Sequence, residues 1–162
     1  MKPFPWKCGK CRERAVNQVT LPSYSAELEH DGRKYPVSVN DLDAARCDNC
    51  GTIVLDDAAD RRLSDALRLA AGLLLPSEIR QQRESLHLKQ RQLANYLQIS
   101  ESTLCRWETG AQIQQRVMDK LLMGFFWVLE FRRFLGVPDP VKQPIPDSLL
   151  GVVRWWEANG GR

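Results

Sequence analysis

Two Cys-x-x-Cys pairs constrain this 162-residue chain more than any other feature of its sequence. Their cysteines are Cys8, Cys11, Cys47 and Cys50, and Gly51 follows the second pair. Each pair is typical of a tight knuckle, so four thiolates can meet one tetrahedral ion at about 2.3 Å. Four thiolates leave no open position for water or substrate. The pattern therefore predicts one structural Zn²⁺ per chain, which could contribute about 10–16 kcal/mol to folding.

Redox chemistry and disulfide bonding are the alternative uses of these cysteines. A redox dithiol needs one Cys-x-x-Cys in a strand-to-helix setting, whereas this chain has two and the first precedes a polar, arginine-rich stretch. The start at Met1 shows no apolar signal segment, which predicts a cytoplasmic location where thiols stay reduced. Zinc is thus the first hypothesis, redox the second and disulfides the third. Cys105 is expected to be a reduced thiol on a helix.

Hydrophobic periodicity and turn signals predict an α+β protein. Short antiparallel strands are expected at 15–21, 24–29, 33–39 and 52–55, with a turn at Asp31-Gly32. Asp56-Asp57 suits the start of a helix that ends near Gly72, and Pro76 suits the first turn of the next. The predicted domains are a four-cysteine zinc-binding β domain at 1–56, a connecting helix and linker at 57–75, an all-helical domain at 76–135, and a proline-rich segment with a short C-terminal helix at 136–162.

The helical domain carries a helix, a tight turn and a second helix within 90–110. Ser100 is expected to cap the second of these helices by accepting from the Thr103 N–H. Gly110 is expected to end it in a left-handed conformation. Gln98 lies where the turn needs the same conformation, at a cost of about 1 kcal/mol for a residue with a side chain. A long fourth helix is predicted from 114 to 135.

Leu104 and Trp107 would bury one face of that second helix and leave the other face for a DNA major groove. Arg106 is the strongest candidate, because a guanidinium can donate two hydrogen bonds to guanine. The candidates for base contacts are Ser102, Arg106, Glu101 and Thr109. The candidates for phosphate contacts are Lys89, Gln90, Ser100 and Thr103. The alternative is that these are ordinary solvated positions on a small helical bundle.

Charge and composition agree with a binding protein. Residues 1–60 hold eight basic and ten acidic side chains, whereas residues 61–110 hold eight basic and five acidic ones, which suits contact with phosphates. The longest apolar run, 121–129, is too short to span a bilayer. The two histidines, His30 and His87, have no partner that the sequence identifies, so we expect no enzyme.

A symmetric operator requires two copies of the chain, so we expect a homodimer on a palindrome. Leu121, Phe125 and Val128 are the candidates for the dimer interface. Their alternative role is to close the core of the helical domain.

Taken together, the two knuckles, the stretch Ala-Gly-Leu-Leu-Leu-Pro-Ser-Glu-Ile at 71–79 and the segment 97–110 resemble MqsA-type antitoxins. These are also described as YgiT-type zinc finger proteins with an XRE-like helix-turn-helix domain. The resemblance implies a structural zinc domain that helps to bind a small ribonuclease toxin, and a dimer that represses its own promoter. It also implies base contacts at Ser102 and Arg106. The alternative is a stand-alone zinc-finger/helix-turn-helix regulator with no toxin.

Overall fold

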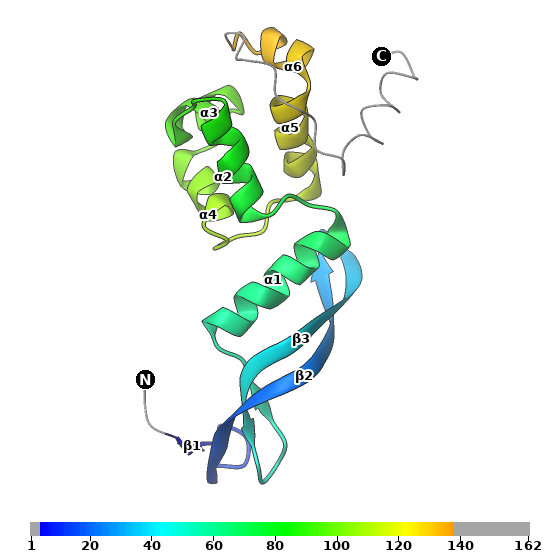
Figure 1. Ribbon diagram of the computed structural model, residues 1–162, viewed down its shortest axis with the longest axis vertical. Coiled ribbons are helices and arrows are strands. Elements are labelled where there is room, and N and C mark those ends of the chain that lie inside the picture. Colours follow the sequence, from blue (N-terminus) through cyan, green and yellow to red (C-terminus); the bar gives the residue numbers. More distant parts are fainter. Residues whose placement is uncertain (1–3, 138–162) are drawn as a thin grey trace.

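The computed structural model describes residues 4–137 of the chain. A long two-stranded ribbon carries the cysteines at one end and approaches a helical unit at the other (Figure 1). The strands are β1 (Trp6–Lys7), β2 (Arg14–His30), β3 (Arg33–Cys47) and β4 (Ile53–Val54), paired antiparallel in the order β1-β2-β3-β4. The predicted α+β class is confirmed. The proline-rich segment and C-terminal helix predicted for 136–162 lie outside the described residues, apart from Gly136 and Val137.

The ribbon is longer than predicted, because two expected strands are one. β2 continues through Pro22, and β3 extends well past residue 39 to Cys47. Pairing holds on both sides of Pro22, from Leu21 opposite Leu42 to Ser23 opposite Asn40. The prediction of separate strands at 15–21 and 24–29 was therefore wrong. Proline has no N–H group to donate. At Pro22, however, β2 pairs with β3 alone, so an N–H group is not needed on its other edge.

Asp41, the residue that faces Pro22, has a left-handed φ of 48°. The inward-facing positions shift by one residue there, from Val39 to Leu42 on β3. Arg62 stabilises the β3 backbone at this irregularity, because its guanidinium donates to the carbonyl oxygens of Asp41 at 2.5 Å and Asn40 at 2.6 Å. The irregularity thus keeps one face of the ribbon apolar along its length.

Helix α1 (Asp57–Ala71) covers that apolar face. Asp56 caps its start by accepting from the N–H groups of Ala58 and Ala59, and Gly72 ends it at φ 66°, as predicted. The contacts join two sets of residues: Ala59, Leu63 and Leu67 from α1, and Val37, Val39 and Leu42 from β3. The segment 57–75 therefore supplies half of the ribbon's core as well as the connection to the helical unit.

The helical unit contains α2 (Pro76–Ser85), α3 (Gln90–Tyr96), α4 (Glu101–Glu108), α5 (Arg116–Trp127) and α6 (Leu129–Phe134). Its core includes the fully buried side chains of Ile79, Leu93, Leu104, Leu122 and Phe125. The turn before α4 and the end of α4 follow the prediction. Ser100 Oγ accepts from the Thr103 N–H at 3.0 Å, Gln98 has φ 54° and Gly110 has φ 77°.

The single long helix predicted for 114–135 was wrong, because the chain bends at Val128 between α5 and α6. Val128 has extended backbone angles, φ −102° and ψ 107°. The buried Arg132 folds back and donates to the carbonyl oxygens of Phe125 at 2.9 Å and Phe126 at 2.6 Å. These carbonyls end α5, and a helix terminus needs such donors. The guanidinium therefore stabilises a bend that hydrophobic periodicity does not indicate.

Candidate metal centre and nucleic-acid interface

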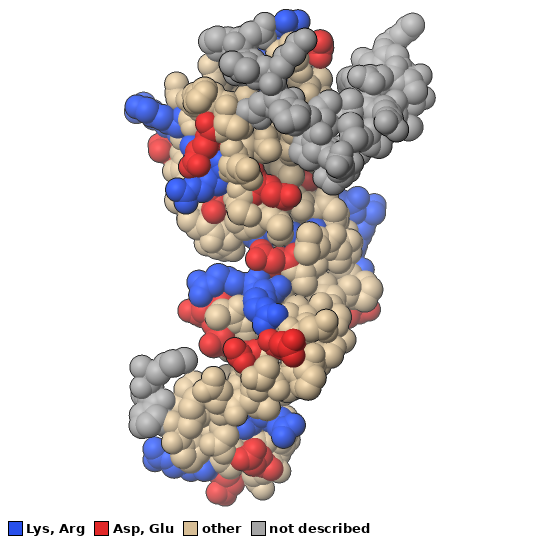
Figure 2. Space-filling view, viewed as in Figure 1, with Lys and Arg blue, Asp and Glu red and all other residues tan. Residues whose placement is uncertain are grey.

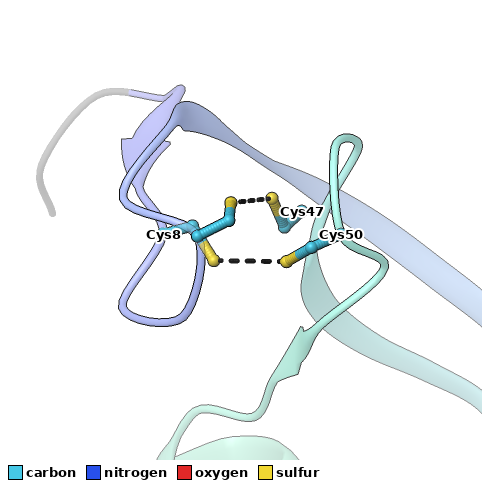
Figure 3. Close-up of side chains that lie close together, drawn as sticks. Cys8, Cys47 and Cys50 are labelled. Carbon is cyan, nitrogen blue, oxygen red and sulfur yellow. Dashed lines mark hydrogen bonds between the residues drawn. The ribbon is translucent and has the colours of Figure 1, made fainter.

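The four cysteines of the two knuckles meet at one end of the ribbon (Figure 3). Their sulfur atoms all lie within 4.8 Å of one another, and the Cys8–Cys50 and Cys11–Cys47 sulfurs are each 3.6 Å apart. Sulfurs bound tetrahedrally at 2.3 Å would lie about 3.8 Å apart. A disulfide needs about 2.05 Å, and all five cysteines are free. The arrangement fits a structural metal site with four thiolate ligands.

Both knuckles are built by the same backbone device. The N–H of Arg12 donates to the Cys8 carbonyl at 3.0 Å, and the N–H of Gly51 donates to the Cys47 carbonyl at 2.8 Å. Arg12 and Gly51 both follow the second cysteine of their pair, and both are left-handed, at φ 65° and 70°. Each cysteine pair is therefore closed into a tight turn that aims two sulfurs the same way.

Hydrogen bonds lower the pKa of two of the four thiols, those of Cys50 and Cys8. The Thr52 hydroxyl lies 3.1 Å from Cys50 Sγ, and its hydrogen bond is the main cause that lowers the pKa of Cys50 to about 6. Backbone N–H groups of Cys11 and Lys10 lower the pKa of Cys8. A cation bound by thiolates must displace their protons, so these donors favour metal binding.

Cys47 and Cys8 are the two most buried cysteines of the cluster, but the pKa of Cys47 shifts upward instead of downward. The backbone hydrogen bond from Cys50 lowers its pKa, but burial and hydrogen bonding with the neighbouring thiols outweigh that effect and raise the pKa to about 11. Burial thus favours the protonated thiol at this position, and a bound cation would offset that cost, since the charge of the ion compensates for lost hydration.

The predicted base contacts all lie on the exposed side of α4. Glu101, Ser102, Arg106 and Thr109 are exposed, whereas Leu104 and Trp107 on the opposite side are 0% and 3% exposed. Among the predicted phosphate contacts, Lys89 and Ser100 are exposed, and Gln90 and Thr103 are half-buried. The Ser100 hydroxyl also lies 2.9 Å from that of Ser102, so the cap and one candidate base contact are linked.

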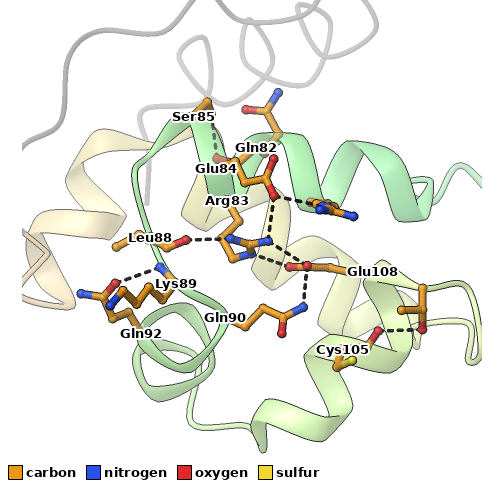
Figure 4. Close-up of polar contacts among 12 residues, drawn as sticks. Gln82, Arg83, Glu84, Ser85, Leu88, Lys89, Gln90, Gln92, Cys105 and Glu108 are labelled. Carbon is orange, nitrogen blue, oxygen red and sulfur yellow. Dashed lines mark hydrogen bonds and ion pairs between the residues drawn. The ribbon is translucent and has the colours of Figure 1, made fainter.

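A buried ion pair fixes α4 to the rest of the helical unit (Figure 4). Arg83 of α2 donates to both carboxylate oxygens of Glu108, from Nε at 2.7 Å and from Nη2 at 3.0 Å. Gln90 at the start of α3 donates to the same carboxylate at 2.8 Å. Gln90 thus has a structural contact in addition to its predicted role. The sequence analysis did not single out Glu108, although it lies in the segment 97–110 that contributes to the resemblance.

The candidates for the dimer interface lie in different environments. Phe125 is 0% exposed within the helical core, whereas Leu121 and Val128 are half-buried. The most exposed large apolar side chains of this unit are Val117 at 75% and Phe134 at 83%. The side chain of Phe125 is therefore already packed within its own chain.

Residues 79–125 match the Helix-turn-helix family model, a span that runs from α2 into α5 and includes the turn before α4. The chain thus contains an XRE-like helix-turn-helix domain, and a domain of this family belongs to DNA-binding transcription regulators rather than to enzymes. No curated protein matches the chain. Within residues 4–137, no helix is both long and apolar enough to cross a membrane.

Proposed function

We propose that this protein is a transcriptional repressor that binds a palindromic operator in its own promoter as a homodimer, and that it is the antitoxin of a small ribonuclease toxin. The observation that carries the repressor role is the sidedness of α4. Its polar side chains project outward from a helix whose opposite side is fixed by the core and by the Arg83–Glu108 pair.

In this proposal α4 enters the major groove. Arg106 donates two hydrogen bonds to a guanine, and Ser102, one turn earlier, reaches a neighbouring base edge with less selectivity. Glu101 and Thr109 flank them on the same exposed side. Lys89, Gln90, Ser100 and Thr103 contact phosphates and fix the register of the protein on the duplex.

The four-cysteine cluster holds Zn²⁺ in this proposal. The ion has no open position, so it supplies folding energy to its end of the ribbon and takes part in no reaction. The dimer forms through the outer side of α5 and α6, where half-buried Leu121 lies one helical turn from the exposed Val117 and half-buried Val128 separates the two helices. Phe125 supports this surface from within the core.

The DNA half is tested by selecting duplexes from a random pool with the purified full chain. We expect enrichment of a palindrome that also occurs upstream of the gene. Arg106→Ala should lose about 1–3 kcal/mol of discrimination at one base pair. Lys89→Ala is the matched control, since a lost phosphate contact should weaken binding to all sequences alike and reduce the salt slope by about one. If Arg106→Ala discriminates at every base pair of the enriched site as well as the wild type does, the groove assignment is excluded.

The antitoxin half needs a separate test, because the DNA half does not depend on it. A neighbouring gene should encode a ribonuclease that is toxic alone and harmless when co-expressed with this chain. The resemblance to MqsA-type antitoxins supports this expectation. If the neighbouring product is harmless alone, the stand-alone regulator is the better description.

A further inference from the structure

The loop that joins α4 to α5 is held by the N-terminal half of the chain. We call residues 110–116 the clasp loop. Four of its polar partners come from the hairpin tip between β2 and β3 and from α1: His30, Asp31, Tyr35 and Arg68. The loop directly follows the DNA-reading helix, so its anchorage bears on operator binding.

The hairpin tip caps α5 from 85 residues away. Asp31 Oδ2 accepts from the backbone N–H of Arg116, the first residue of α5, at 2.7 Å. Gln115, at the N-cap position itself, makes no side-chain cap in the described structure. Asp31 therefore does what an N-cap aspartate does locally: it satisfies a free donor and places negative charge at the positive helix end.

Two more contacts join the tip to the same loop. Arg116 Nη1 donates to the Tyr35 hydroxyl at 3.0 Å, and His30 Nε2 lies 3.1 Å from the Gln114 carbonyl oxygen. The tip thus contacts both the backbone and a side chain around the start of α5.

Arg68 of α1 reaches the other end of the clasp loop. Its side chain is 1% exposed and lies 3.0 Å from Asp65, and Nη2 donates to the carbonyl oxygens of Gln112 at 3.2 Å and Gly110 at 3.5 Å. A buried guanidinium without such acceptors would be strongly unfavourable. The loop carbonyls are therefore part of what allows Arg68 to be buried.

The contact continues into α4. The N–H of Gln112 donates to the carbonyl of Arg106 at 3.2 Å. Two consecutive hydrogen bonds, Arg68 to Gln112 and Gln112 to Arg106, connect α1 with the residue proposed to read guanine. Arg106 lies in the last turn of α4, so the clasp loop sets how that turn ends.

The linker before α2 is fixed at the same place. The Leu74 N–H donates to Asp119 Oδ1 at 2.9 Å, and Gln114 Nε2 donates to the Leu74 carbonyl at 2.7 Å. Asp119 and Gln114 are both 0% exposed. The connection between the two halves is therefore a buried, hydrogen-bonded joint.

We propose that Arg68 and Asp31 are positioning residues for operator binding, acting through the clasp loop. This inference rests on the proposed DNA-binding function. With the loop anchored, the last turn of α4 is ordered before it meets DNA. Without the anchors, ordering must accompany binding and weakens it. The N-terminal unit is thus part of the DNA-binding apparatus as well as the carrier of the metal site.

The test compares two arginines of α1 in the full chain. Arg68→Met removes the donors to the clasp loop but keeps the aliphatic length. Arg62→Met is the matched control, because Arg62 also donates to backbone carbonyls, but to those of Asn40 and Asp41 in the ribbon. The probes are the duplex enriched by the wild-type chain and a scrambled duplex, together with amide hydrogen exchange at Gln112 and Arg116.

For Arg68→Met we expect about a tenfold loss of affinity for the enriched duplex, unchanged binding to scrambled DNA, and faster exchange at Gln112. Arg62→Met should match the wild type in all three. An equal loss of affinity for the enriched duplex in Arg68→Met and Arg62→Met would overturn the proposal. So would an affinity of Arg68→Met for this duplex equal to that of the wild type.

A second pair covers the case in which Arg68→Met does not fold. Asp31→Ala removes the distant cap of α5, and Asp56→Ala removes the local cap of α1. Only Asp31→Ala should speed amide exchange at Arg116 and weaken binding to the enriched duplex. If Asp56→Ala has the same effect, the positioning role is excluded.

If the wild-type chain enriches no duplex, it is the proposed DNA-binding function that fails. Hydrogen exchange alone then decides whether the clasp loop is anchored.

Discussion

The two ends of the β2–β3 ribbon are stabilised in opposite ways. At the cysteine end, Cys8 and Cys47 form a small buried cluster with Val16 and Ala45, Cys11 and Cys50 pack against it, and all of these residues come from the N-terminal third of the chain. At the tip, hydrogen bonds reach residues 110–116 in the helical unit. One end organises itself around a candidate ion, and the other depends on a different part of the chain. A single hairpin therefore belongs to two structural units. Helix α1 packs against the ribbon between its two ends (Figure 1), and in the same view both basic and acidic side chains gather over that middle region (Figure 2).

The largest expected effect comes from removing the metal ligands. Cys47→Ser should release the ion and disorder residues 4–16 and 45–55, because metal binding of this kind contributes on the order of 10–16 kcal/mol to local folding. The ribbon around Leu42, α1 and the helical unit should stay folded, since their cores contain none of the cysteines. Amide exchange mapped along the chain and the metal content of the purified protein measure both parts.

Cys105→Ser is the matched control for this experiment. Cys105 lies on α4, far from the cluster in sequence, and its substitution should leave the metal content unchanged. If Cys47→Ser unfolds the helical unit together with the cysteine end in one transition, the two ends of the ribbon are not independent.

The second-largest expected effect comes from breaking the buried ion pair of the helical unit. Glu108→Ala leaves the buried Arg83 without its bidentate, buried carboxylate partner and should destabilise the helices by about 3–5 kcal/mol. The hairpin tip should loosen with them, because its partners lie in the clasp loop. The metal should stay bound. Thermal unfolding followed together with metal release by a chromogenic chelator would show the helices melting before the ion leaves.

Glu84→Ala controls for the lost carboxylate. Glu84 also contacts Arg83, at 3.3 Å, but its side chain is 52% exposed. An exposed pair contributes about 0–1 kcal/mol, so this variant should melt close to the wild type. Simultaneous melting and metal release in Glu108→Ala would show that the cysteine end depends on the helices.

The same contrast explains what the sequence could predict. Each Cys-x-x-Cys knuckle, the Ser100 cap and the left-handed Gln98 and Gly110 are local patterns, each decided within about four residues, and the structure agrees with them. The bend at Val128 depends on Arg132 folding back onto carbonyls of the preceding helix. Nothing in the spacing of apolar residues indicates that bend, so periodicity predicts one helix.

The sequence does not indicate the contacts of the clasp loop, for a related reason. Asp31 was interpreted correctly as a turn residue, but its second role requires Arg116 to lie beside it in space. Likewise Arg83 of α2 pairs with Glu108, which lies 25 residues further along the chain. Polar contacts of this kind carry no periodic signal. The chemistry of the metal site was thus predictable from the sequence, while the coupling between the halves required the structure.

The smallest expected effect compares the two knuckles within the cysteine end itself. Arg12 and Gly51 hold equivalent left-handed positions, but only the glycine adopts that conformation without strain. Arg12→Gly should therefore raise the stability of the metal-bound cysteine end by about 1 kcal/mol, and Gly51→Ala should lower it by about the same amount, since open space surrounds Gly51 and only backbone strain changes. Competition with a chelator of known affinity measures both as opposite shifts in metal retention. Shifts of the same sign would show that the two knuckles do not share one backbone geometry.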